Sequence, residues 1–290
     1  MRAPCARPPI RCRASWWAAA SVLALAAIAL LATGATACAQ VEASHHLSMA
    51  APDLEADPRA ASARVAVYGD SLVWEAQGLL SDQLQAEVPI WVQSFGGTAL
   101  CDYTDQIVRE SSARPSRLVV IGFTGNTYTP CMDRVGPSPT GEEIAAAYTE
   151  DLGRLLEDLG RAGTPVLLVG APPSLALDGS TYWTSINQAW RDEADRRTRE
   201  GADVTYADSG QALADPDGHW AATLPCLLLE DASRGCVDGH IRVRSDDRAH
   251  FCPELEPARE GVIQGCAVWN GGAWRYSAAI ADAIRARLSS

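Results

Sequence analysis

Short apolar segments alternate with longer amphipathic segments over residues 64–207, and this alternation is the feature that most restricts the fold. The apolar segments have the length and aliphatic character of buried strands: 64–68, 90–95, 117–123, 165–170 and 203–207. Segments with helical periodicity lie between or after them: 72–86, 103–112, 141–162, 182–199 and 273–288. This order predicts an α/β fold, a three-layer α/β/α sandwich with a mostly parallel five-stranded sheet.

Residues 208–272 break the alternation with glycine, proline, tryptophan and four cysteines. We expect long disulfide-tied loops there. In a sheet of this kind, ligands bind beyond the carboxyl ends of the strands, so the residues that follow each strand are the first candidates for a site.

The first 37 residues have the pattern of an export signal. Four arginines precede an uncharged apolar run over residues 14–41, and Ala35-Thr36-Ala37 satisfies an A-x-A cleavage site. Cys38 directly after it also resembles a bacterial lipobox, and the run is long enough to cross roughly 30 Å of hydrocarbon. Free secretion, a lipid on Cys38 and an uncleaved N-terminal anchor therefore stay open, and each implies an extracytoplasmic or cell-envelope location.

The segment that follows has no sustained apolar period. Residues 38–62 are rich in alanine, serine, proline and acidic side chains, which predicts a flexible linker. We therefore expect a signal peptide over 1–37, a linker over 38–62 and one domain over 63–290.

The charge balance excludes several function classes. The chain carries a net charge of −12, and because its first 37 residues hold four arginines and no acid, the rest carries −16. No basic cluster is present to neutralise phosphates, so nucleic acid is not an expected partner. None of the 24 cationic residues is a lysine, which excludes a lysine base or a Schiff base.

Six cysteines follow the linker, an even number that is typical of disulfides in an exported protein. A zinc site would favour a close pair such as C-x-x-C, which is absent. We expect neighbours in sequence to pair, as Cys101–Cys131, Cys226–Cys236 and Cys252–Cys266. The sequence alone leaves the other connectivities open.

Polar blocks follow the first three predicted strands, and a fourth block comes late in the chain. The first strand leads into Gly69-Asp70-Ser71, the second into Gly96-Gly97 and the third into Gly125-Asn126. Asp247 and His250 stand three residues apart near the C-terminal helix, and no other histidine has an aspartate at that spacing. The first block has a second interpretation, because a serine at the start of a helix is a common N-cap.

Together these blocks, over about residues 65–253, resemble the SGNH (GDSL-type) hydrolases, and the GGTALCD and HFCP stretches resemble their exported actinobacterial members. The resemblance implies a flavodoxin-like fold and a serine hydrolase without cofactor or metal. It implies Ser71 as nucleophile, His250 as base and Asp247 as the carboxylate that orients it. The implied oxyanion hole consists of the backbone N–H groups of Ser71 and Gly97 and the side-chain amide of Asn126, with Gly96 as an alternative to Gly97.

The function expected from this resemblance is an esterase that removes short acyl groups, such as acetate, from a carbohydrate or another cell-envelope polymer. Tyr128 and Phe251 flank the blocks and are expected to line the acyl pocket. Trp220 and Trp269 either bind sugars or pack in the core. Two other functions stay open: acyl transfer to a glycan acceptor, and a non-catalytic envelope-binding module.

Overall fold

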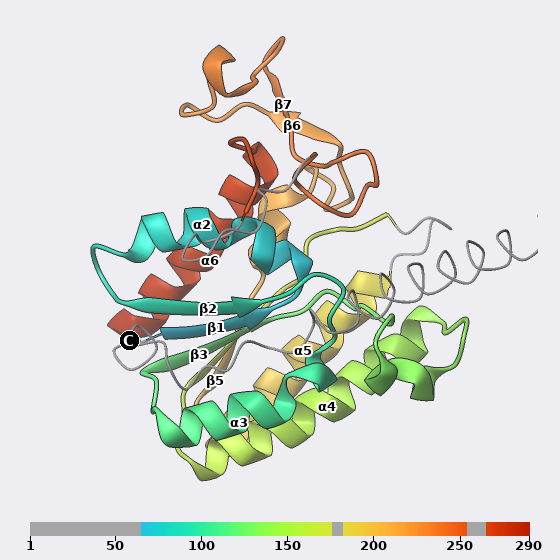
Figure 1. Ribbon diagram of the computed structural model, residues 1–290, viewed down its shortest axis with the longest axis vertical. Coiled ribbons are helices and arrows are strands. Elements are labelled where there is room, and N and C mark those ends of the chain that lie inside the picture. Colours follow the sequence, from blue (N-terminus) through green and yellow to red (C-terminus); the bar gives the residue numbers. More distant parts are fainter. Residues whose placement is uncertain (1–64, 176–181, 254–264) are drawn as a thin grey trace, which may run out of the picture. The chain divides into compact units, whose positions relative to one another are not determined.

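The computed structural model describes residues 65–175, 182–253 and 265–290 (Figure 1). Its main sheet has five parallel strands: β1 (Val65–Gly69), β2 (Ile90–Ser94), β3 (Leu118–Gly122), β4 (Val166–Val169) and β5 (Val204–Ala207). Each begins and ends within one residue of the segment expected from the sequence. The predicted five-stranded parallel sheet is therefore confirmed.

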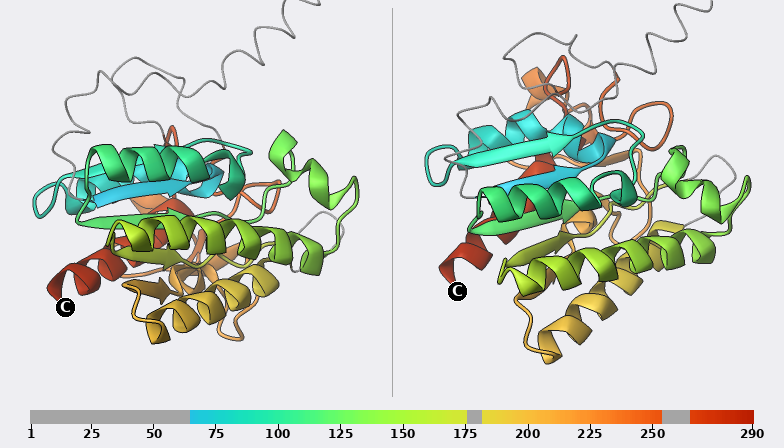
Figure 2. Two further views of the ribbon diagram at one scale, coloured as in Figure 1. Left: turned by 90° about the horizontal axis from the view of Figure 1, so that it is seen from below. Right: turned by 60° about the horizontal axis from the view of Figure 1, so that its bottom comes forward.

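Helices cover both faces of this sheet (Figure 1). One face carries α2 (Ser71–Leu84) and α6 (Gly271–Ser289), and the other carries α3 (Thr104–Ala113), α4 (Gly141–Arg161) and α5 (Tyr182–Arg199). Figure 2 shows the same layers from two further directions. The three-layer α/β/α arrangement expected from the sequence is confirmed.

The buried side chains form two hydrophobic clusters, one on each face of the sheet, because successive side chains of a strand point to opposite sides. In β1, Val65 and Val67 belong to the hydrophobic cluster with α2 and α6, whereas Ala66 and Tyr68 belong to the cluster with α3, α4 and α5. All four side chains are buried. Because both faces are covered, the strands are apolar almost throughout and do not alternate with polar residues.

The strand order, β2-β1-β3-β4-β5, determines where a site can form. The chain starts in the interior of the sheet, adds β2 on one side of β1 and then crosses to add β3 on the other side. The register places Gly69 beside both Ser94 and Gly122, so the loops after β1, β2 and β3 leave the sheet at one level. Such a reversal of strand order opens a crevice beyond the carboxyl ends of the strands.

The region after β5 contains more regular structure than the sequence indicated. Within it, β6 (Thr223–Pro225) pairs antiparallel with β7 (His240–Arg242), and Cys226–Cys236 is a disulfide next to this pair. Short 3-10 helices lie in this region and in the loops after β2 and β3: η3 (Leu100–Asp102), η4 (Pro130–Val135), η5 (Ser209–Leu213) and η6 (Ala232–Arg234). The sequence predicted only loops at these positions, because segments of three to six residues are too short for a recognisable period.

The predicted signal peptide (1–37) and linker (38–62) lie outside the described residues. Among the residues that are described, no helix combines the length and the apolar character needed to cross a membrane.

Candidate active site

Ser71 is the first residue of α2, directly after the turn that ends β1. The N-cap of this helix is Asp70, whose Oδ1 accepts a hydrogen bond of 3.1 Å from the backbone N–H of Leu72. The helix start is therefore capped by the aspartate, and the alternative role for Ser71 as the cap does not apply. Gly69 permits the close turn, since a Cβ at this position would lie 2.7 Å from the carbonyl oxygen of Gly122.

Asp70 also joins the loop after β1 to the loop after β3. Its Oδ2 accepts hydrogen bonds from the backbone N–H of Thr124 (2.7 Å), the Thr124 hydroxyl (2.6 Å) and the Asn126 amide (3.3 Å). The side chain is completely buried, and burial raises the pKa of Asp70 although the hydrogen bonds from Thr124 and Leu72 oppose the rise. This carboxyl group therefore serves the framework of the site.

His250 reaches Ser71 from a loop 179 residues further along the chain. Its Nε2 lies 2.9 Å from Ser71 Oγ, and its Nδ1 lies 2.6 Å from Asp247 Oδ2. A proton on Nδ1 donated to the carboxylate leaves Nε2 free to accept the serine proton. Hydroxyl, imidazole and carboxylate thus form one continuous hydrogen-bonded series.

The loop of Asp247 is organised by the same carboxylate that contacts the imidazole. Asp247 Oδ1 accepts hydrogen bonds from the Ser245 hydroxyl (2.6 Å) and from the backbone N–H groups of His250 (2.9 Å) and Ala249 (3.0 Å). Burial by itself would raise the pKa of Asp247, but these hydrogen bonds and the one from the imidazole outweigh it and hold that pKa well below its ordinary value. The group is therefore an anion at neutral pH.

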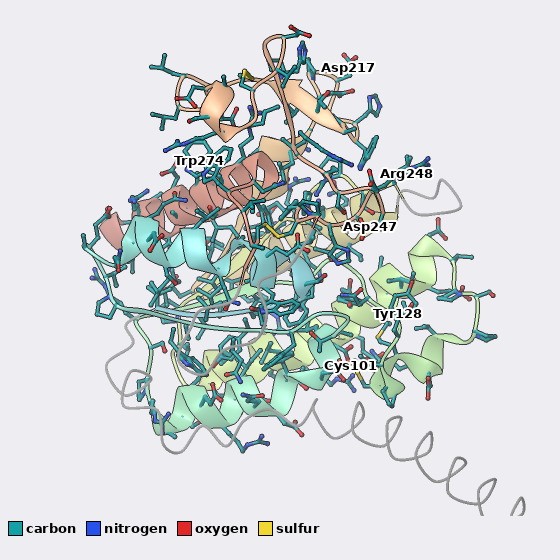
Figure 3. All side chains as sticks on the ribbon, turned by 45° about the horizontal axis from the view of Figure 1, so that its top comes forward. Cys101, Tyr128, Asp217, Asp247, Arg248 and Trp274 are labelled. Atoms are coloured by element: carbon teal, nitrogen blue, oxygen red, sulfur yellow. A yellow bond between two sulfur atoms is a disulfide. The ribbon has the colours of Figure 1, made fainter. Side chains whose placement is uncertain are left out.

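Two further side chains, Trp220 and Arg244, donate hydrogen bonds to backbone carbonyls of this loop. The indole N–H of Trp220 donates to the carbonyl of Arg248 (2.8 Å), a residue with a positive φ of 67° at the loop tip beside Asp247 (Figure 3). The buried guanidinium of Arg244 donates to the carbonyls of Ala249 (3.2 Å) and Pro173 (2.6 Å). Burial lowers the pKa of Arg244 to about 10, so the group stays cationic at neutral pH.

A pocket of about 490 Å³ opens in front of the serine. It is lined by Ser71, Trp74, Glu75, Gly96, Gly97, Asp247, His250, Cys252 and Pro253. Trp74 and Glu75 were not expected from the sequence. The expectation for Tyr128 and Phe251 is wrong for this pocket: Phe251 is buried against Tyr276, and Tyr128 is 86% exposed outside the lining.

The glycine and asparagine blocks are joined to each other, and the glycine block lines the pocket of Ser71. Gly96 and Gly97 both line the pocket with Ser71; a Cβ on Gly96 would lie 3.9 Å from the Cβ of Ser71, and Gly97 has a positive φ of 76°. Asn126 donates its amide to the carbonyl of Thr98 (3.1 Å) as well as to Asp70, and so links the loops after β2 and β3.

Three disulfides tie the loops, with the pairing expected from the sequence: Cys101–Cys131, Cys226–Cys236 and Cys252–Cys266. The first joins η3 to η4, directly after the glycine and asparagine blocks. The third begins two residues after His250.

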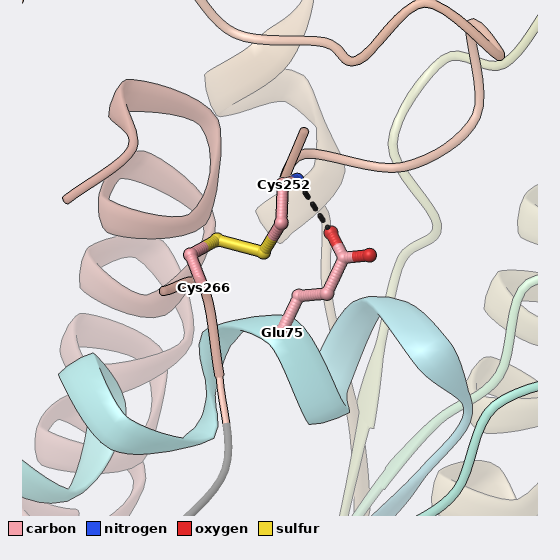
Figure 4. A group of neighbouring side chains, drawn as sticks. All are labelled: Glu75, Cys252 and Cys266. Carbon is pink, nitrogen blue, oxygen red and sulfur yellow. Dashed lines mark hydrogen bonds between the residues drawn. A yellow bond between two sulfur atoms is a disulfide. The ribbon is translucent and has the colours of Figure 1, made fainter. Parts of the chain in front are cut away.

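Two groups of side chains in the described part of the chain have the spacing of metal ligands. The first is Glu75 with Cys252 and Cys266, but both sulfur atoms are in the disulfide and are not free thiolates (Figure 4). The second is Asp215, Asp217 and His219. In that group Asp215 Oδ1 already accepts the backbone N–H groups of the other two residues, as in a polar turn.

Comparison with known proteins gives one family match. The family model described as "Protein of unknown function (DUF459)" matches residues 64–254. No curated protein matches the sequence.

Solved structures provide further similarities. A GDSL-like lipase from Bacteroides thetaiotaomicron has 11% sequence identity and a TM-score of 0.48, over 85% of this chain and 97% of the lipase. The C-terminal catalytic domain of peptidoglycan O-acetyltransferase A from Streptococcus pneumoniae has 14% identity and a TM-score of 0.45, over 79% of this chain and 96% of that domain.

Proposed function

The chain belongs to the family described as "Protein of unknown function (DUF459)". From this premise we propose that it is an SGNH-type serine esterase that removes short acyl groups through an acyl-enzyme on Ser71. The observation that supports this most strongly is the hydrogen-bonded series of Ser71, His250 and Asp247, with contacts of 2.9 and 2.6 Å. A hydroxyl is a weak nucleophile at its free pKa and needs such a base.

The first half of the reaction forms the acyl-enzyme. His250 Nε2 accepts the proton of Ser71 as Oγ attacks the ester carbonyl carbon, and the carbonyl π electrons move to its oxygen. Asp247, which stays anionic, stabilises the resulting imidazolium. The tetrahedral intermediate then collapses, the alcohol oxygen leaves, and the imidazolium returns the proton to that alcohol.

The second half repeats these steps with water. His250 accepts a proton from water, whose oxygen attacks the acyl carbon, and Ser71 leaves with the proton returned by the imidazolium. The acid is released and the free enzyme is restored.

We propose that the negative oxygen of both tetrahedral intermediates accepts hydrogen bonds from the backbone N–H groups of Ser71 and Gly97 and from the side-chain amide of Asn126. Each such donor contributes about 3–4 kcal/mol to transition-state stabilisation. The amide of Asn126 already has two acceptors, so donation to an oxyanion replaces one of them. The contact to Asp70, at 3.3 Å, is the longer of the two and the easier to exchange.

The pocket favours a short acyl group. Its lining offers Trp74, Pro253 and the Cys252 disulfide as apolar surface, beside glycines and charged side chains. The apolar part of this lining is limited to these three residues, which supports a short acyl group over a long one. The aromatic wall of Trp74 is suited to an acylated sugar, so we propose an O-acetylated carbohydrate or cell-envelope polymer as substrate.

We place this activity outside the cytoplasm. Three disulfides within the described residues are typical of a protein that folds in an oxidising compartment. Whether residues 1–38 act as a cleaved signal, a lipid attachment site or an anchor stays a prediction from the sequence.

Replacing the serine tests the proposal. Ser71→Ala is expected to lower kcat for p-nitrophenyl acetate by roughly 10⁴- to 10⁶-fold, because the covalent route is lost and only binding and the oxyanion hole remain. A fluorophosphonate probe is expected to label the wild type at Ser71 and to leave the variant unlabelled.

An unlabelled wild-type protein that still binds acylated glycans would contradict the esterase and favour a binding module. Product analysis with an added glycan acceptor separates hydrolysis from acyl transfer, since only transfer yields an acylated acceptor.

A further inference from the structure

Glu75 is a buried carboxylate next to the proposed catalytic groups, and the steps above do not use it. It lies on α2 one helical turn after Ser71, so the two side chains occupy the same side of the helix. Its side chain lines the pocket, yet the residue is only 3% exposed. A carboxylate in such a place requires hydrogen-bond partners, because burying an unpaired charge is costly.

The partners of Glu75 come from the loop that carries His250. Oε2 accepts the backbone N–H of Phe251 at 2.6 Å and that of Cys252 at 3.0 Å. Figure 4 shows the second of these bonds, beside the disulfide from Cys252 to Cys266. The two residues directly after the imidazole are thus attached to the helix that carries the serine.

Resting on the esterase function proposed above, we propose that Glu75 is a positioning residue, which fixes His250 Nε2 within hydrogen-bond distance of Ser71 Oγ. The link between the two groups is short: one turn of α2, one side chain and one peptide unit. Along the chain, Ser71 and His250 are separated by 179 residues.

Within the described residues, and apart from the contact of Ser71 itself, the hydrogen bonds between α2 and residues 245–253 are those of Glu75. Asp247 orients the imidazole but belongs to the same loop, and Arg244 holds that loop to the carbonyl of Pro173. Neither residue lies on α2. Gly265, next to Cys266, packs against the backbone of Glu75, since a Cβ there would lie 3.3 Å from its carbonyl oxygen. The segment that the disulfide joins to Cys252 therefore lies against the same turn of α2 that carries the carboxylate.

Two substitutions of similar size distinguish the effect of the acceptor oxygen on activity from the effect of side-chain volume. Glu75→Gln keeps an oxygen that can accept both N–H groups, whereas Glu75→Met fills the space without an acceptor. Glu75→Met is expected to lower kcat for p-nitrophenyl acetate on the order of 10²-fold with little change in KM, because a displacement of about 1 Å between reacting groups has such an effect. Glu75→Gln is expected to retain most of the wild-type kcat.

Glu75→Asp provides a third variant that keeps the charge and shortens the side chain by one methylene. It no longer reaches the loop in the present geometry, so its kcat is expected to fall as well. Glu230→Gln is a control at a second buried carboxylate, which accepts the backbone N–H of Leu227 and is ion-paired with Arg275, in the β6–β7 region outside the pocket lining. We expect it to change the melting temperature and not kcat.

Wild-type kcat in Glu75→Met or in Glu75→Asp would overturn the positioning role while the esterase function stands. An equal loss of kcat in Glu75→Gln and Glu75→Met would also overturn the positioning role, because kcat would then not depend on the acceptor oxygen. A wild-type protein that a fluorophosphonate does not label at Ser71 would contradict the esterase function, and the positioning role with it.

Discussion

At the residue scale, two neighbouring residues at the start of α2 have different roles. Asp70 caps the helix and binds the loop after β3, while Ser71 directs its hydroxyl to His250. Adjacent residues at a turn point in different directions, so one carboxylate supports the framework and one hydroxyl is available for chemistry. The Gly-Asp-Ser block therefore combines a structural and a chemical requirement in three residues.

The buried carboxyl of Glu75 makes a pH-dependent contribution to stability. Burial raises its pKa, and the nearby His250 together with the two backbone N–H groups reduces this rise without cancelling it. Because the folded pKa is above the unfolded value, the folded state binds more protons than the unfolded state between these two values. Stability is therefore lost as the pH rises through this window, which begins near the ordinary glutamate pKa of about 4.3.

Glu75→Gln removes this penalty and keeps an acceptor oxygen. We expect the variant to melt at a higher temperature than the wild type at pH 7, and the difference to disappear below about pH 4, where Glu75 is protonated in both states. Thermal melts followed by circular dichroism over this pH range measure the effect. A difference that is constant with pH would show that Glu75 does not titrate as described.

At the element scale, the Cys101–Cys131 disulfide joins the two short helices that follow the glycine and asparagine loops. Asn126 bridges the same loops by its hydrogen bond to Thr98. The covalent and the hydrogen-bonded links together keep the proposed oxyanion donors on two separate strand ends at a fixed separation.

Removing this disulfide in Cys101→Ala/Cys131→Ala is expected to lower the free energy of unfolding by roughly 3–4 kcal/mol, the chain-entropy value for a loop of this size. Because the glycine and asparagine loops separate more easily, kcat is expected to fall as well. Guanidinium unfolding and p-nitrophenyl acetate turnover measure the two effects.

Cys226→Ala/Cys236→Ala is the matched control, since this pair closes a smaller loop beside β6 and β7. We expect it to lower stability by roughly 2–3 kcal/mol and to leave kcat unchanged. Unchanged kcat in both double variants would contradict the role of Cys101–Cys131 in holding the loops.

At the scale of the whole molecule, the net negative charge disfavours anionic substrates. Residues 38–290 carry a net charge of −16, and the pocket contains Asp247 and Glu75. The field of the protein therefore opposes the approach of an anionic ester, and salt screens this repulsion beyond a distance of about 8–10 Å.

We expect kcat/KM for an anionic ester, the p-nitrophenyl monoester of a dicarboxylic acid, to rise a few-fold between about 10 and 200 mM NaCl. The value for neutral p-nitrophenyl acetate is expected to stay constant over the same range. Equal salt dependence for both esters would show that the net charge does not act on substrate approach.

Much of the fold follows from patterns that are local in the sequence. The length and aliphatic character of the five strands, and the helical period between them, predicted a parallel sheet with two helical layers. The β6–β7 pair was missed because strands of three residues have no period to detect. Trp74 and Glu75 were missed because a side chain on a helix carries no local sign of which pocket it will face.

The sequence by itself determined the strand-helix order and the residue types available for chemistry, because both depend on neighbours along the chain. Only the tertiary structure decided that Asp70 binds the loop after β3, that Phe251 is buried away from the pocket, and that Glu75 meets the loop of His250. The physical reason is that these contacts join segments up to 177 residues apart, and they form only after burial of the two hydrophobic layers has brought the segments together.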